Sequence, residues 1–197
     1  MQKLNYTFDK RRFETFIDAV IAIILTILVL ELKVPEESHG ADVSTKDQVI
    51  SLLPFLLSYV GSFLLIAGIW IDHHTLFLNV HSITKRYIFL NMIFILMLSL
   101  VPFTTAFAGK NHHDPFAVAL LFSNYFIMNI SFAALYWYGY YKNLIPKAFF
   151  TDNEKNKVYS SLGLLGLIIA IPVAYLNTYL SFILGIIIFS FHLLKKK

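Results

Sequence analysis

Long apolar blocks separated by short polar stretches dominate the chain. Six of them are near the length that spans a bilayer as a helix, about 20 residues. We predict spans at residues 13–34, 49–71, 87–108, 116–138, 158–175 and 179–194. The last two are short, and the break between them depends on Asn177 and Thr178 alone. The pattern predicts an all-α integral membrane protein, with six transmembrane helices in a single domain covering residues 1–197.

The composition agrees with this pattern. Of the 197 residues, 57% are hydrophobic and 14% are charged, whereas about a quarter of the residues of a soluble domain are charged. There are no cysteines, which excludes disulfides and thiolate metal sites. We expect no cofactor and no bound metal.

The basic residues predict the orientation, because cytoplasmic loops carry an excess of Lys and Arg. With the N-terminus inside, 13 of the 16 basic residues fall on the inner side and 3 on the outer side. The three outer residues are Lys33, Lys46 and Lys110. We therefore expect a multi-pass protein of the cell (plasma) membrane with both termini cytoplasmic. The net charge of +4 belongs to the inner membrane face and does not indicate nucleic-acid binding.

The first predicted helix carries one apolar stripe and several ionisable residues. Successive residues of an α-helix are about 100° apart, which places six side chains on one arc: Phe16, Ala19, Ile23, Thr26, Ile27 and Leu30. Asp18 lies about 140° from this stripe, where a buried carboxylate would need partners. Periodicity alone leaves two interpretations open, a stripe that packs against helices or lipid and a stripe that lines a pore.

The same helix contains a recognisable motif. Arg12, Phe16 and Asp18 form the pattern Arg-x-x-x-Phe-x-Asp, followed by Ala-Ile-x-x-Thr-x-Leu-Val-Leu-Glu-Leu from Ala22. This segment resembles the opening helix of the transmembrane protein 175 family, the lysosomal-type potassium channels of animals and their smaller prokaryotic relatives. Ile17 replaces the family's usual serine. Further matching positions follow along the chain: Trp70, His73, His74, Asn91 and Pro102-Phe103-Thr104.

The resemblance implies a potassium-permeable channel, a homotetramer embedded in membrane lipid with its first helices around a central pore. It implies a pore constriction at Ile23, Ile27 and Leu30, and ion selectivity at Thr26, with other monovalent cations passing more weakly than potassium. The chain has no Thr-Val-Gly-Tyr-Gly filter. The resemblance also implies a structural network at the inner end of the helices: Arg12, Asp18, Trp70, His73, His74 and Asn91.

Acidic residues follow the first helix at the predicted outer side: Glu31, Glu36, Glu37 and Asp42. Repeated around a tetramer, they would raise the local concentration of cations. His112, His113 and Asp114 are expected in a solvated outer turn, with proton sensing as an alternative.

The alternatives to a channel are a coupled transporter and an enzyme. A proton- or cation-coupled secondary transporter, with Asp18 as the titrating group, is the alternative function. We do not expect an enzyme, because we find no nucleophile–base pair and no cofactor motif in the sequence.

Overall fold

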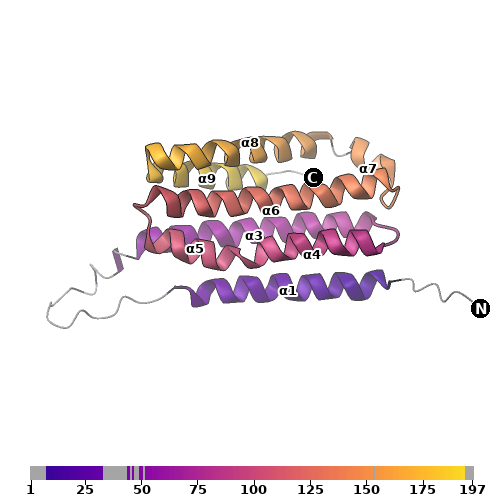
Figure 1. Cartoon of the computed structure of the whole chain (residues 1–197), viewed down its shortest axis with the longest axis horizontal. Helices are drawn as coiled ribbons and strands as arrows, with labels where there is room; N and C mark the ends of the chain where they lie inside the picture. The colour runs from indigo at the N-terminus through magenta and orange to yellow at the C-terminus, as the bar shows by residue number, and fades with distance from the viewer. Residues whose placement is uncertain are drawn as a thin grey trace, which may run out of the picture.

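The computed structural model describes residues 8–32, 44, 46, 49–50, 52–152 and 154–193. All of its regular elements are helices, which agrees with the predicted all-α class (Figure 1). They are α1 (Lys10–Leu30), α3 (Leu53–Asn79), α4 (Lys85–Ser99), α5 (Val101–Lys110), α6 (Pro115–Tyr141), α7 (Lys147–Asp152), α8 (Glu154–Leu176) and α9 (Thr178–Leu193).

Four helical segments in the described part of the chain are long and apolar enough to cross a membrane. They are Lys10–Leu30, Phe55–Asn79, Lys85–Lys110 and Pro115–Tyr141. Two shorter apolar segments, Gly163–Leu176 and Thr178–Ile188, lie in α8 and α9. Within the described residues, each apolar block predicted from the sequence is therefore mostly helical, and the chain is a multi-pass membrane protein.

The third predicted span contains a break that the apolar pattern did not indicate. Pro102 has no backbone N–H to donate to the carbonyl of Leu98, and its ring disturbs the preceding turn. Accordingly α4 ends at Ser99 and α5 begins at Val101. The Thr104 hydroxyl lies 3.2 Å from the carbonyl oxygens of Leu100 and Val101, so it stabilises the carbonyl groups beside the break.

The predicted break before the last helix is confirmed. α8 ends at Leu176 and α9 begins at Thr178. The Asn177 side-chain oxygen accepts a hydrogen bond of 3.1 Å from the backbone N–H of Leu180. Asparagine is among the best residues for satisfying the free N–H groups of a first helical turn. One residue thus ends one helix and caps the next.

The helices lie side by side as a bundle, with α1 at one edge and the α8–α9 hairpin at the opposite side (Figure 1). α6 is central and packs against α4, α5, α8 and α9. α8 and α9 approach closely at Gly166, where an added Cβ would lie 2.6 Å from Cδ1 of Ile188. Small residues commonly permit such close packing between membrane helices.

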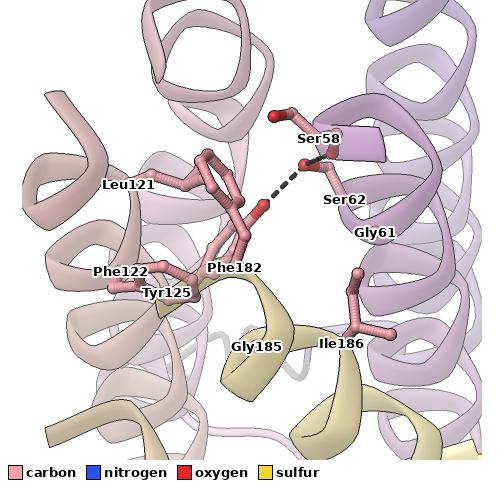
Figure 2. A pocket seen from close by; sticks show the side chains of 9 residues that line it. All are labelled: Ser58, Gly61, Ser62, Leu121, Phe122, Tyr125, Phe182, Gly185 and Ile186. Atoms are coloured by element: carbon pink, nitrogen blue, oxygen red, sulfur yellow. Dashed lines mark hydrogen bonds between the residues drawn. The ribbon is translucent and has the colours of Figure 1, made fainter. Parts of the chain in front are cut away.

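Buried hydroxyl groups connect three helices of the bundle. Ser62 on α3 donates a 2.6 Å hydrogen bond to the Ser58 carbonyl. Its oxygen also lies 2.7 Å from the Thr105 hydroxyl of α5 and 2.5 Å from the Tyr125 hydroxyl of α6. Because Ser62 uses its one proton on the Ser58 carbonyl, its oxygen can only accept from these hydroxyls. A pocket of about 20 Å³ adjoins this cluster where α3, α6 and α9 meet (Figure 2), which is room for about one water molecule.

Candidate permeation surface on α1

One face of α1 is packed inside the subunit. Ile17, Ile21, Ile24 and Leu28 are at most 4% exposed. They recur at three- and four-residue spacing, the periodicity of a single helical face. α1 packs against α3, α4 and α5, so this face anchors the helix to the rest of the bundle.

The opposite face of α1 is uncovered within the subunit. All six residues of the predicted stripe are exposed: Phe16, Ala19, Ile23, Thr26, Ile27 and Leu30. Exposure reaches 56% for Ile23 and 71% for Leu30. The structure therefore brings the four residues expected at the pore onto one continuous surface, with Thr26 as a polar group among apolar neighbours.

The Thr26 hydroxyl has a defined orientation. It donates a 2.8 Å hydrogen bond to the carbonyl of Ile23. A threonine in a helix bonds to a carbonyl three or four residues back, and here the bond reaches Ile23 rather than Ala22. Because the single hydroxyl proton is used by the backbone, the remaining oxygen lone pairs can only accept. An oxygen in this state can coordinate a cation.

Two side-chain contacts join α1 to α3 at the end where α1 begins. The indole Nε1 of Trp70 donates a 3.0 Å hydrogen bond to the Asp18 carboxylate. One turn closer to the end, His74 Nδ1 lies 3.8 Å from a carboxylate oxygen of Glu14. The rings of Trp70 and His74 stack with centroids 5.8 Å apart. The Trp70–Asp18 hydrogen bond in particular helps to fix the angular position of α1 and thereby the direction of its exposed stripe.

His73 belongs to a separate cluster in the core. Its Nε2 lies 3.1 Å from the side-chain oxygen of Asn91, whose amide in turn donates to the Tyr87 carbonyl at 2.9 Å. The imidazole stacks on Phe77 at 4.4 Å and on Phe94 at 5.7 Å between ring centroids. Since Asn91 offers an oxygen, His73 carries a proton on Nε2. This cluster joins α3 to α4.

The six residues expected in one inner network thus divide into two groups. Asp18, Trp70 and His74 lie at the α1–α3 contact, and His73 and Asn91 lie at the α3–α4 contact. The Arg12 side chain is exposed and joins neither group among the described residues. Glu14 takes part although the prediction omitted it. Glu14 lies four residues before Asp18, and Trp70 lies four residues before His74, so each pair shares one face of its helix. This spacing is the sequence signal that could have identified Glu14.

The opposite end of α1 is only partly described. Glu31 follows the last residue of α1 and is half-buried. The expected positions Glu36, Glu37 and Asp42 lie outside the described residues.

In the α5–α6 turn, His113 Nδ1 lies 3.3 Å from the Tyr179 hydroxyl at the start of α9. The turn therefore contacts the α8–α9 hairpin. Among the described residues, no group of three His, Cys, Asp or Glu side chains is placed to hold a metal ion.

Comparisons with known proteins support one family. A family model described as the endosomal/lysosomal potassium channel TMEM175 matches residues 12–102. A potassium channel from Chryseobacterium sp. is 40% identical over 103 residues, 52% of this chain and 50% of the relative. A potassium channel from Chamaesiphon minutus is 34% identical over 99 residues, 50% of this chain and 49% of the relative. The chain thus spans about half the length of these curated relatives.

A solved structure extends the likeness to nearly the whole fold. It is the crystal structure of a lysosomal potassium-selective channel TMEM175 homolog from Chamaesiphon minutus, with a TM-score of 0.84 and 23% identity. The similarity covers 94% of this chain and 97% of that one. The protein described here is accordingly a multi-helix membrane protein with the fold of that homolog. Residues 12–102, just under half of the chain, match the TMEM175 family model, and the chain is similar to bacterial proteins named potassium channels.

Proposed function

We propose that this chain forms a potassium-permeable cation channel in the cell membrane, as a homotetramer with the four α1 helices around the pore. The family match supports this proposal, as do bacterial relatives that are named potassium channels. In this arrangement the uncovered stripe of each α1 faces the pore axis. The buried face of α1 attaches it to its own subunit.

The observation that carries the proposal is the exposed apolar face of α1. Ile23, Ile27 and Leu30 are 56%, 40% and 71% exposed, whereas their neighbours Ile24 and Leu28 are 4% and 1% exposed. Four copies of the exposed face would form successive rings of aliphatic side chains. Such rings form a hydrophobic constriction that can gate ion flow by losing its water.

Thr26 would supply the ion-coordinating group within this constriction. Its oxygen lies on the exposed face, and its hydroxyl donates a hydrogen bond to the Ile23 carbonyl. Four such oxygens could replace part of the hydration shell of a potassium ion, as carbonyl oxygens do in other channels. In this mechanism the potassium preference resides in a side-chain ring, and a loop filter is not required.

The orientation proposed from the basic residues places the start of α1 at the cytoplasmic face. The Glu31 carboxylate would then lie near the outer mouth, together with Glu36, Glu37 and Asp42. Acidic groups around a pore entrance raise the local cation concentration. They favour cations over anions and do not discriminate potassium from sodium.

Planar-bilayer recording of the purified protein under a potassium/sodium gradient tests the proposal. We expect currents that do not saturate at moderate ion concentrations. Their reversal potential should be shifted from zero toward the equilibrium potential of potassium. The rival function, a coupled transporter with Asp18 as the titrating group, predicts saturable flux that requires a proton gradient. A flux of that kind, abolished in Asp18→Asn, would contradict the channel. Native mass spectrometry of the same sample should give the mass of four chains.

A further inference from the structure

The first turn of α4 and the last turn of α6 lie together at one end of the bundle. This is the end at which α1 begins (Figure 1). The Thr84 and Tyr138 hydroxyls are 3.4 Å apart. The backbone N–H of His81 donates a 2.9 Å hydrogen bond to the Leu144 carbonyl, so the α3–α4 and α6–α7 connections are joined directly.

Four exposed cations lie on these two connected segments. Lys85 and Arg86 begin α4, and Lys142 and Lys147 follow α6. The sequence has no acidic residue between Asp72 and Asp114, and none between Asp114 and Asp152. Among the described residues, none of the four cations forms an ion pair. The basic start of α1 differs, because Asp9 and Glu14 lie within the same turns.

Exposed aromatic rings lie one turn further along each helix. Trp137 and Tyr141 on α6 are 59% and 71% exposed, and their rings stack with centroids 6.0 Å apart. Phe89 on α4 is 65% exposed and follows Arg86. Trp and Tyr concentrate at the level of lipid headgroups in membrane proteins. The cations beyond them are therefore placed at the headgroup level.

The turn that carries Lys142 is closed by backbone hydrogen bonds. The N–H of Leu144 donates to the Gly139 carbonyl at 2.9 Å, and Asn143 has a φ of 51°. A Cβ at position 139 would collide with Ile145, which is itself 1% exposed. The turn is thus the compact left-handed ending common at helix C-termini. Lys142 projects from a fixed piece of backbone.

We propose that this surface binds the headgroup of an anionic phospholipid from the leaflet at that end of the bundle. Four cations that form no ion pair with any described residue match a phosphate-bearing, negatively charged headgroup, and the aromatic rings match the adjoining acyl region. The leaflet is the cytoplasmic one if the orientation given under the proposed function holds. The binding itself does not depend on channel activity.

Tryptophan quenching by brominated lipids tests this assignment in the full-length protein. The purified protein is reconstituted in phosphatidylcholine vesicles containing either brominated phosphatidylglycerol or brominated phosphatidylcholine at equal mole fraction. We expect stronger quenching by the anionic lipid, with Trp137→Phe removing most of the excess. Lys85→Gln/Lys142→Gln should lower the relative affinity for phosphatidylglycerol at least about fivefold, and Lys85→Arg/Lys142→Arg should retain it.

A charge-matched pair separates a specific site from general surface attraction. Lys10→Gln/Arg11→Gln removes two charges from the same end of the bundle and should leave the excess quenching within about twofold of wild type. Equal losses in the two pairs would overturn the proposal, as would the absence of excess quenching in wild type. Competition by soluble glycerophosphate would show a site for free anions and would also overturn it. Currents in pure phosphatidylcholine bilayers, measured separately, report on the proposed channel alone.

Discussion

α1 and α6 are both long apolar helices, but they differ in how the subunit surrounds them. Half of the spanning window of α6 is buried, against 22% for α1. α6 packs against α4, α5, α8 and α9, whereas the main packing partners of α1 are α3, α4 and α5. Lipid tails are as apolar as leucine, so apolar side chains alone do not drive helices together in a membrane. The comparison shows that burial, rather than hydrophobicity, distinguishes a packing face from a face left for another partner.

The polar residues of the two helices differ in the same way. On α6, Tyr125 and Asn124 are buried and bond to hydroxyls of Ser62 and Thr104 on neighbouring helices. On α1, the Thr26 hydroxyl is exposed and bonds only within its own helix. These polar groups of α6 therefore hold the subunit together, and Thr26 remains available to a group outside it. Five predictions test this contrast.

The largest effect should come from the same substitution on the two faces of α1. Ile24→Asn places an amide in the core and should lower the free energy of unfolding by about 3 kcal/mol. Ile23→Asn lies on the exposed face and should change it by about 0.5 kcal/mol or less. Equilibrium unfolding in mixed detergent micelles measures both. Equal destabilisation would mean that the two faces are not distinguished by packing.

The contact that orients α1 should have a measurable coupling energy. Asp18→Ala and Trp70→Phe each remove the 3.0 Å hydrogen bond, and a hydrogen bond to a charged group contributes about 1.5 kcal/mol. The two substitutions should therefore be non-additive by about that amount in a double-mutant cycle. Ser99→Ala with Trp70→Phe is a distant control pair and should be additive.

Asp18 should influence stability and assembly more than ion preference. Asp18→Asn should reduce the yield of assembled protein while leaving the reversal potential of the remaining channels unchanged. A normal yield with an altered reversal potential would place Asp18 on the permeation path.

Polar substitution in the constriction should increase conductance. Ile23→Asn, Ile27→Asn and Leu30→Asn would each allow water into an aliphatic ring. Lowering the barrier by about 1.4 kcal/mol would raise the single-channel current about tenfold. Val29→Asn is a matched control, because Val29 is 45% exposed but lies outside the stripe. Unchanged currents in all three variants would place the pore elsewhere.

The smallest effect concerns the hydroxyl on the stripe. Thr26→Val keeps the shape of the side chain and removes its oxygen, so the potassium-over-sodium permeability ratio should fall about threefold, equivalent to about 0.65 kcal/mol. The reversal potential of wild type and variant under one bi-ionic gradient measures this change. Thr26→Ser retains the oxygen and should keep most of the ratio. Equal values for wild type and Thr26→Val would leave Thr26 with only its bond to the Ile23 carbonyl.

Much of the fold could be predicted from local signals in the sequence. The lengths of the apolar blocks predicted the positions of the long helices. Asn177 predicted the break between the last two helices, because helix capping depends on a single local side chain. The break before Pro102 lay inside a continuous apolar run, so hydropathy could not indicate it.

The sequence by itself determined which residues share the stripe on α1, because helical periodicity alone fixes their angular positions. Only the tertiary structure decided that this stripe is the uncovered face and that Ile17, Ile21, Ile24 and Leu28 are the buried one. Both faces are aliphatic, so no local pattern separates them. The division of the inner residues into two clusters was likewise decided by packing. Which carboxylate meets Trp70 or His74 depends on the register of α1 against α3, and that register is set by side chains distant in the chain.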